Sequence, residues 1–359
     1  MYHSPLAQAA GSFLFQAISI SESPTCRPNA FGGCATLNTS TNFQTMPSIT
    51  KDIALCAQYL RDGHLIAMPT ETVYGLAADA LQESAVNRVF ALKGRPSTNP
   101  LIVHIHDAEQ ASQWAAEITP QTQRLMAAFW PGPLTLVLPA RDEVLRCVTA
   151  GQNSVAIRVP AHPMAQQLLR SFGSGLVAPS ANRYMSISPT SAEHVAKQFH
   201  DSELTVLDGG PCQVGLESSI VSLLPGDRPR LLRRGMISCM HLQQILGEQL
   251  EESAGGLRAP GQHLRHYAPT TPAQSFTQPP VDALDSHANG WIWCGHAHAS
   301  QGPGINLGSD PEQYAAGFYA ALYQLDALGL QRIYIQLPPH QEAWAAVHDR
   351  MTRACHSIA

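Results

Sequence analysis

The sequence predicts an α/β fold of about two domains. From residue 48 onward, short aliphatic runs alternate with longer segments whose apolar residues recur every three or four positions. The 359 residues suggest about two domains at roughly 150 residues each. A hydrophobic share of 44% with a net charge of -5 is enough apolar material to bury a core.

Residues 1–46 lie outside this pattern. They hold one acidic residue, Glu22, and one basic residue, Arg27, among many Ser, Thr, Asn and Gln. No basic residue precedes the short apolar run 11–15, which argues against a secretory signal. We interpret residues 1–46 as a disordered extension. Met46-Pro47 opens the patterned sequence, so Met46 is a candidate start codon.

Capping residues and breakers delimit the elements before residue 240. Ser48 or Thr50 can cap a first helix that ends at Arg61. The run 130–133, Trp-Pro-Gly-Pro, ends a helix over 121–129. Thr190 and Glu193 have capping-box spacing at the start of a helix over 190–199. Two more helices are expected over 83–92 and 162–170. Strands are expected over 65–68, 101–105, 134–138, 155–159, 176–178, 205–207, 219–223 and 229–232.

A smaller α/β unit follows an irregular stretch. Gly, Pro and Thr dominate 253–261 and 268–272, as in a linker. Beyond it, strands are expected over 291–294 and 333–335 and helices over 311–328 and 344–354. In the first of these helices, four large apolar residues share one face. They are Tyr314, Phe318, Leu322 and Leu325.

Composition narrows the function classes. Charged residues make up only 14% and the pI is near 6.3, which argues against a surface coated in basic charge for nucleic acid. No stretch approaches the roughly 20 apolar residues of a membrane-spanning helix. The eight cysteines form no CxxC pair or zinc pattern, so we expect reduced thiols in the cytoplasm.

Four polar clusters stand at expected strand ends or in loops. The first is 69–76, where hydroxyls, a carboxylate and a phenol crowd around a glycine. In the second, 93–101, Lys93 and Arg95 lie two residues apart in a proline-stiffened loop. Such fixed cations suit a polyphosphate, although a solvated loop fits the residues equally well.

The third cluster joins Arg158, a cation inside an apolar strand, to the later segment 178–182. A buried charge needs a partner, which would be a ligand carboxylate or one of Glu71 and Glu217. The fourth cluster joins 217–220 to 233–235. No Walker loop, GxGxxG, GxSxG or carboxylate cage is present. The site therefore looks like one that positions ligands and neutralises charge, with no protein metal site, and a nucleotide would carry its own Mg²⁺ on its phosphates.

Taken together, the clusters resemble the YrdC-type L-threonylcarbamoyladenylate synthase family. The segment 259–272 resembles the linker of its long form, which carries a small Rossmann-like C-terminal domain. The resemblance implies a catalytic domain over 47–240, a linker and lid over 241–275, and a C-terminal domain over 276–359. The matching stretches are PTETVYGL (69–76), KGRPSTNPLIVHI (93–105), WPGPLTLVL (130–138), SVAIRVPAHP (154–163), APSAN (178–182), SPTSAEHV (188–195), GLESSIV (215–221) and LLRRG (231–235).

The resemblance implies a fold and a reaction. The fold is a twisted mixed sheet with helices and a concave basic cleft. The reaction converts bicarbonate, L-threonine and ATP to threonylcarbamoyl-AMP and pyrophosphate. A tRNA threonylcarbamoyl-transferase would take the product to make t6A at position 37 of tRNA. Whether the chain itself touches tRNA is left open.

The resemblance also assigns roles. Threonine would be held by Thr72, His104, Arg158, Ala178 and Ser218, and ATP by Arg95, Asn99, Ser154, Ser180, Ser188, Arg233 and Tyr267. Lys93 and Arg95 would be the catalytic cations, Lys93 against the phosphates, and Tyr267 would act as a lid. Tyr74 and Asn182 would line the site. Tyr184-Met185 stand where the family usually has Ser-Gly, and Ser219 replaces a usual Thr.

Two other readings remain at this point. An RNA-binding or ribosome-associated module could use Lys93, Arg95, Arg233 and Arg234 as its basic cleft, although aromatic residues do not interleave with them. A carbamoyl-transfer unit like that of hydrogenase maturation proteins ranks lower, because no acylphosphatase module or zinc-finger motif accompanies it.

Overall fold

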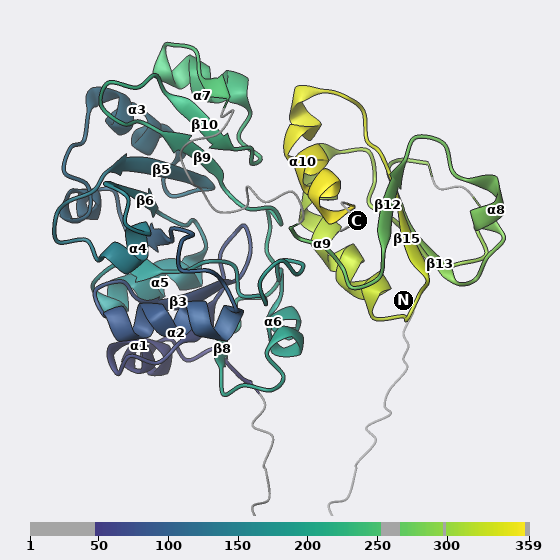
Figure 1. Cartoon of the computed structure of the whole chain (residues 1–359), viewed down its shortest axis with the longest axis horizontal. Coiled ribbons are helices and arrows are strands. Elements are labelled where there is room, and N and C mark those ends of the chain that lie inside the picture. The colour runs from purple at the N-terminus through teal and green to yellow at the C-terminus, as the bar shows by residue number, and fades with distance from the viewer. Residues whose placement is uncertain (1–46, 253–265, 297–298, 356–359) are drawn as a thin grey trace, which may run out of the picture. The chain divides into compact units, whose positions relative to one another are not determined.

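The larger sheet of the protein is mixed and twisted. The structure is a computed structural model, and it describes residues 47–252, 266–296 and 299–355. Within these residues one sheet has eleven strands in the order β1-β8-β2-β3-β7-β4-β6-β5-β9-β10-β11. Its neighbouring strands β6, β5, β9 and β10 can be followed in Figure 1. Its strands are β1 (Ser48–Thr50), β2 (Ile66–Met68), β3 (Gly75–Asp79), β4 (Ile102–His104), β5 (Leu134–Pro139), β6 (Ser154–Arg158), β7 (Leu176–Val177), β8 (Thr205–Leu207), β9 (Ser219–Ser222), β10 (Arg230–Arg233) and β11 (Glu251–Glu252).

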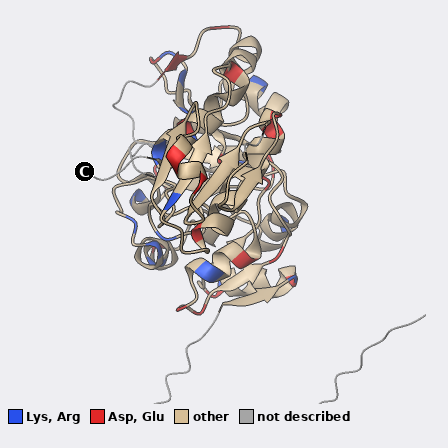
Figure 2. Cartoon of the chain, turned by 90° about the vertical axis from the view of Figure 1, so that its right-hand side faces the viewer, with Lys and Arg blue, Asp and Glu red and all other residues tan. Residues whose placement is uncertain are grey.

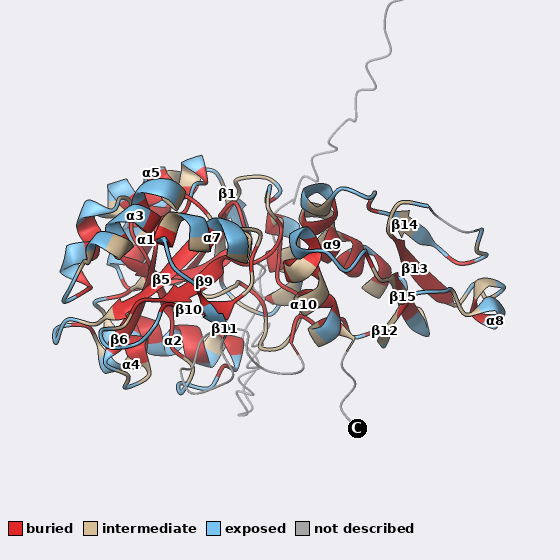
Figure 3. Cartoon of the chain, turned by 90° about the horizontal axis from the view of Figure 1, so that it is seen from above, coloured by how far each residue is buried: buried red, intermediate tan, exposed pale blue. Residues whose placement is uncertain are grey.

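Helices cover both faces of this sheet, with α3 and α5 on one side and α2 and α4 on the other (Figure 3). Buried residues, red in that view, concentrate in the strands and on the inner sides of the helices. The helices are α1 (Ile53–Arg61), α2 (Glu83–Lys93), the 3-10 helix η1 (Glu109–Gln113), α3 (Pro120–Phe129), α4 (Arg146–Thr149), α5 (Pro163–Phe172), α6 (Ala192–Gln198) and α7 (Cys239–Leu246).

A second sheet of four parallel strands follows in the order β12-β15-β13-β14. The predicted apolar face of α9 is buried beside it, and Trp291, Trp293 and Tyr334 stack in a separate cluster, the two indoles 5.1 Å apart. The elements are β12 (Ala273–Phe276), α8 (Val281–Leu284), β13 (Asn289–Trp293), β14 (Gly304–Asn306), α9 (Pro311–Asp326), β15 (Arg332–Gln336), the 3-10 helix η2 (Glu342–Trp344) and α10 (Ala345–Ala354).

The residues expected to cap α1 and α6 are not the ones that cap them in the structure. Ser48 and Thr50 form β1, which pairs with β8 about 157 positions later, and Asp52 caps α1 by accepting from the Leu55 amide. Ser191, not Thr190, caps α6 by accepting from the His194 amide. Asp and Ser are better caps than Thr, which favours Asp52 over Thr50 and Ser191 over Thr190, and Ser48 and Thr50 are already engaged in the pairing with β8.

Both boundaries expected for the linker fall inside regular elements. The boundary at 240/241 lies within α7, which packs against α3 and so belongs with the larger sheet. The boundary at 275/276 lies within β12, which pairs with β15 and so belongs with the smaller sheet. The central part of the linker, and the extension over 1–46, lie outside the described residues.

The helices α9 and α10 join the smaller sheet to the larger one. Gly215 has φ +77°, and a Cβ there would lie 2.5 Å from the Ala315 oxygen of α9, so the loop and the helix touch through backbone. The Tyr323 hydroxyl donates to the Ile187 carbonyl at 2.8 Å, and the Tyr323 ring stacks on His194 at 4.0 Å. No helix in the described ranges is long and apolar enough to cross a membrane.

Candidate functional site

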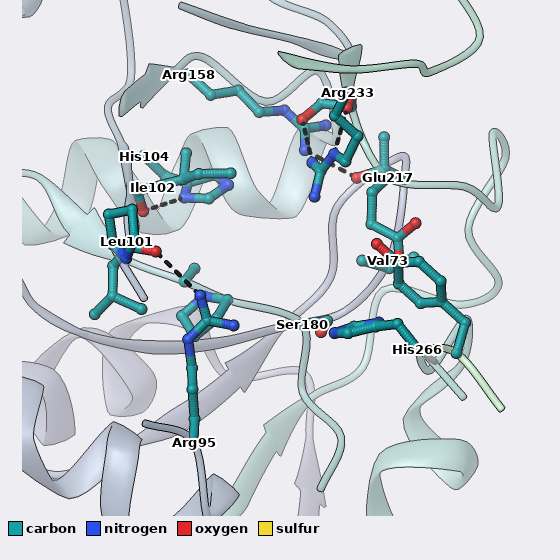
Figure 4. Close-up of a pocket in the computed structure, with 16 residues that line it drawn as sticks. Val73, Arg95, Leu101, Ile102, His104, Arg158, Ser180, Glu217, Arg233 and His266 are labelled. Carbon is teal, nitrogen blue, oxygen red and sulfur yellow. Dashed lines mark hydrogen bonds between the residues drawn. The ribbon is translucent and has the colours of Figure 1, made fainter. Parts of the chain in front are cut away.

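A pocket opens where the loops after β2, α2 and β7 meet β4, β6 and β10 (Figure 4). It encloses about 530 Å³ of empty space, part of it open to solvent, which suits a small ligand. Among the residues that the structure describes, three guanidinium groups and one carboxylate reach its wall, an excess of positive charge that favours an anion. The lining residues are Thr72, Val73, Arg95, Pro100, Leu101, Ile102, His104, Arg158, Ala178, Pro179, Ser180, Glu217, Ser218, Arg233, His266 and Tyr267.

Arg158 forms one corner of the pocket at the end of β6. Its Nη2 donates to Glu71 Oε1 at 2.5 Å, its Nη1 to Thr72 Oγ1 at 2.9 Å and its Nε to the Gly132 carbonyl at 3.2 Å. Glu71 Oε2 also accepts from the Ala161 amide at 3.0 Å. Of the partners that the sequence allows for Arg158, Glu71 is therefore the one that it contacts in the structure. Five N–H groups on a guanidinium leave Arg158 two more donors for a ligand carboxylate.

The hydroxyl of Thr72 has a defined direction. Thr70 Oγ1 lies 2.6 Å from the Val73 carbonyl, which can only accept, so the Thr70 proton goes there. The contact of 2.9 Å between the Thr70 and Thr72 hydroxyls must then be donated by Thr72. Thr72 therefore offers a ligand only an oxygen lone pair. A ligand with a carboxylate for Arg158 and a cationic donor for Thr72 matches this corner.

Two further arginines, Arg95 and Arg233, line the pocket beyond that corner. Arg233, at the end of β10, donates from Nε to the Ser218 carbonyl and from Nη2 to the Ser218 hydroxyl, each at 3.0 Å. Arg95 donates from Nη2 to the Pro100 carbonyl at 3.1 Å, while its buried Nε has no partner in the structure. Burial lowers the pKa of Arg95 to about 10, and Arg233 adds to this effect. Both cations would gain from an anionic ligand.

Two histidines of the pocket are held neutral. Burial lowers the pKa of His104 to about 3, and the nearby Arg158 cation acts in the same direction. Its ring faces two backbone carbonyls, that of Ile102 at 3.2 Å from Nδ1 and that of Leu176, and the neutral ring has one N–H to donate. Burial also lowers the pKa of His266 to about 3, and the buried His266 Nδ1 has no partner in the structure. The orphaned nitrogens of His266 and Arg95 are free to meet polar ligand atoms.

Lys93 ends α2 behind the pocket and does not line it. Its ammonium donates to the carbonyls of Ser180 and Asn182, the second at 2.6 Å. Burial lowers its pKa well below the usual range, and the Arg95 charge adds to this. Lys93 therefore holds the loop after β7, which brings Ser180 to the pocket wall.

Tyr267 closes one side of the pocket. The ring is 1% exposed and packs against His266 at 4.0 Å. Its backbone has φ +61°, and Met185, in the loop it meets, has φ +70°. The Ala268 amide donates to the Met185 carbonyl at 3.1 Å, which ties this loop to the chain after Tyr267. Met185 thus takes a left-handed conformation that glycine adopts without strain, at the place where a glycine is usual in the family the sequence resembles.

Glu217 is the carboxylate of the pocket wall. It accepts from Ser188 Oγ at 2.6 Å, from the Tyr319 hydroxyl at 3.1 Å and from Arg350 Nε at 2.8 Å. Burial alone would raise the pKa of Glu217, but Arg350, then Arg233 and the Ser188 hydrogen bond, outweigh it and lower the pKa. Its two oxygens are therefore ionised and fully engaged.

The structure brings nine of the thirteen sequence-predicted site residues to the pocket wall. Four do not line it: Lys93, Asn99, Ser154 and Ser188. Asn99 donates to the Tyr184 hydroxyl at 3.2 Å, and Ser188 is engaged by Glu217. Tyr74 and Asn182 are buried but do not line the pocket either. Sequence reasoning missed His266, adjacent to Tyr267, and the apolar wall of Val73 and 100–102.

Comparison with known proteins places this chain in a family. Residues 58–235 match the family model Sua5_yciO_yrdC, described as telomere recombination, and residues 237–355 match Sua5_C, described as the C-terminal domain of threonylcarbamoyl-AMP synthase. A threonylcarbamoyl-AMP synthase of Pyrococcus abyssi is 37% identical over 320 residues, covering 84% of this chain and 93% of the relative. The chain belongs to the Sua5/YrdC family.

Further relatives support the two-domain form of the Sua5/YrdC family. A threonylcarbamoyl-AMP synthase of Bacillus subtilis is 36% identical over 324 residues, 84% of this chain and 92% of the relative. The crystal structure of P. abyssi Sua5 complexed with L-threonine superimposes with a TM-score of 0.77 at 33% identity, covering 87% of this chain and 97% of that one. The expected α/β fold with a twisted mixed sheet is confirmed.

Proposed function

We propose that the chain forms threonylcarbamoyl-AMP and pyrophosphate from L-threonine, bicarbonate and ATP. The observation that carries this proposal is the corner of the pocket made by Arg158 and Thr72. Arg158 has donors for an α-carboxylate, and Thr72 has only a lone pair, which suits an α-ammonium group. An amino acid presents those two groups side by side.

The threonine would lie in this corner, with His104, Ala178 and Ser218 around it. His104 is neutral and adds no charge beside the ammonium group. The Ser218 hydroxyl, held between Thr135 at 2.8 Å and Arg233, faces the same space. The P. abyssi relative was solved with L-threonine, which supports L-threonine as the amino acid.

The nucleotide would extend toward Arg95 and Arg233. Their charges match the phosphates, and the Arg95 Nε and His266 Nδ1 atoms lack partners that a nucleotide could supply. Ser180 and Tyr267 complete this half of the pocket, with Lys93 holding the Ser180 loop. The remaining residues assigned to ATP do not line the pocket and would support its wall from behind. They are Asn99, Ser154 and Ser188.

The metal would arrive on the nucleotide. The carboxylate oxygens of Glu217, the acidic residue of the wall, are occupied by Ser188, Tyr319 and Arg350. No group of three or more His, Cys, Asp or Glu side chains in the described part of the chain could hold a metal ion. This donor set fits Mg²⁺ held by the phosphates of ATP, where the ion would neutralise phosphate charge.

In the proposed reaction, the threonine ammonium group first releases a proton. The free amine then attacks CO2, giving a carbamate and a proton, or bicarbonate, giving a carbamate and water. A carbamate oxygen then attacks the α-phosphorus while pyrophosphate leaves. Arg158 and Thr72 orient the amino acid, and Arg95 and Arg233 neutralise the charge that develops on the phosphates. The buried Tyr267 helps to keep water from the carbamate. The product would pass in the cytoplasm to a tRNA threonylcarbamoyl-transferase for t6A synthesis at position 37.

The structure gives little support to the RNA-binding alternative. Of its four basic residues, Lys93, Arg95 and Arg233 are buried, and Arg234 pairs with Glu252 and Glu342. Figure 2 shows basic and acidic residues interspersed on the face in view. A phosphate backbone needs accessible cations in a patch, which these side chains do not form.

Pyrophosphate release tests the proposal. The full chain should release pyrophosphate from ATP only when threonine and bicarbonate are both present. Arg158→Lys keeps the charge but loses the fork geometry, so the KM for threonine should rise about tenfold or more. Equal release of pyrophosphate with and without threonine would contradict the proposed function.

A further inference from the structure

We propose that Arg350, on the C-terminal helix α10, is a positioning residue for the nucleotide half of the pocket. It would act by neutralising Glu217, so that Glu217 does not compete with phosphate for Arg233. The inference rests on the proposed function and adds a role for the C-terminal domain in that same site.

The geometry places Arg350 directly behind the pocket wall. The side chain is fully buried, and its Nε donates to Glu217 Oε2 at 2.8 Å. Its Nη2 lies 3.4 Å from the Glu217 carbonyl, and its Nη1 donates to Asp349 at 2.6 Å. The guanidinium carbon also lies 5.2 Å from the centre of the Tyr267 ring. One cation thus contacts both a charged and an aromatic residue of the wall.

Glu217 has two cations within electrostatic reach. Arg350 lowers its pKa most among the charges, and Arg233 is second. Arg350 is a hydrogen-bond donor to the carboxylate, whereas Arg233 donates to Ser218 and lines the pocket. Without Arg350, the buried carboxylate would have Arg233 as its nearest strong counter-charge. Arg233 would then be drawn toward Glu217 and away from a phosphate.

Tyr319 supports the same arrangement from α9. Its hydroxyl donates to Glu217, and its ring lies 5.7 Å from that of Tyr267. The close backbone contact of Gly215 with α9 fixes the distance between these helices and the loop that carries Glu217. The C-terminal domain therefore presents a formed, buried counter-charge to Glu217.

The test compares Arg350→Met with Arg350→Lys and with the double variant Glu217→Gln/Arg350→Met. Arg350→Met should raise the KM for ATP about tenfold, with a smaller change in kcat, because an unpaired carboxylate opposes the nucleotide. Arg350→Lys keeps the charge and should stay within about threefold of the wild type. The double variant removes both charges and should recover most of the ATP affinity.

Arg353→Met is the matched control on the same helix. Arg353 also pairs with Asp349, its Nη2 donating to Asp349 Oδ1 at 2.8 Å, and its side chain is 21% exposed, whereas that of Arg350 is fully buried. Its KM for ATP should equal that of the wild type. A purely structural role for Arg350 would lower thermal stability and kcat in all Arg350 variants, with no recovery of KM in the double variant, and that result would overturn the proposal.

Calorimetric binding of ATP separates the two proposals. If the wild type binds ATP but releases no threonine-dependent pyrophosphate, the proposed function fails while the ATP affinities still test Arg350. If Arg350→Met does not fold, Arg350→Lys and the double variant are compared with the wild type instead. A tenfold loss of ATP affinity in Arg350→Lys would then overturn the proposal that Arg350 acts by neutralising the charge of Glu217. A wild type that binds no ATP overturns both proposals.

Discussion

Replacing Glu71 by glutamine probes the best-defined corner of the pocket. Its carboxylate serves two donors, Arg158 through Oε1 and the Ala161 amide through Oε2. A glutamine offers only one acceptor oxygen, so one of those donors loses its partner. The Arg158 charge also loses its counter-charge, and water can do little to replace it because both side chains are only 5–6% exposed.

The expected loss follows from that geometry. Removing one member of a buried ion pair costs about 3–5 kcal/mol. We expect Glu71→Gln to lower the free energy of unfolding by about 3 kcal/mol, the low end of this range, because the amide keeps one hydrogen bond. Urea denaturation with a constant m-value measures it. Glu203→Gln, at an exposed carboxylate, is the control and should stay within about 0.5 kcal/mol of the wild type.

Threonine provides the second arm of this experiment. Its carboxylate would replace the lost charge, so saturating threonine should raise the melting temperature of Glu71→Gln by more than it raises that of the wild type. A stability loss below about 1 kcal/mol, with an equal threonine effect in both proteins, would refute the reasoning, because Arg158 would then not depend on Glu71.

Three further predictions test strain, titration and packing. Met185→Gly should raise the free energy of unfolding by about 0.5–1 kcal/mol, since it relieves a left-handed conformation, whereas Met185→Ala should give no gain. The pKa of His104 is about 3 when folded and about 6.5 when unfolded, so the free energy of unfolding should fall as the pH drops below 6.5, by about 2 kcal/mol between pH 7 and 5. Urea titrations at several pH values should show that His104→Gln loses about 2 kcal/mol less than the wild type over this range. Gly215→Ala should cost about 2–4 kcal/mol in urea because its Cβ meets α9, while Gly210→Ala, with φ +78° and open space, should cost about 1 kcal/mol; equal losses would contradict the contact.

Elements with strong local patterns could be predicted from the sequence. The face of α9 and the end of α3 before Pro131 follow from spacing and breakers alone. The strand β3 was missed because Gly-Leu-Ala-Ala-Asp has little β-propensity, and it forms through pairing with β2 and β7. The strand β1 was missed because its partner β8 lies far along the chain.

The site shows the same division. Unusual motifs identified Arg95, Arg158 and Arg233, since a cation is conspicuous in a chain with little charge. The partner of Glu217 could not be found in this way. Tyr319 lies on an apolar helix, where a hydroxyl looks like core, and Arg350 sits among other charged residues of α10. Such contacts depend on the docking of two domains, which no local pattern encodes.

The pairing of Glu217 with Arg350 also has a consequence for synthesis of the protein. The two residues are 133 positions apart. At roughly 5–20 residues per second, the ribosome makes Arg350 about 7–27 s after Glu217. During that interval the elements of the larger sheet can already fold, but the carboxylate behind the nucleotide half lacks its counter-ion. The nascent chain therefore reaches a finished sheet before it reaches a finished pocket.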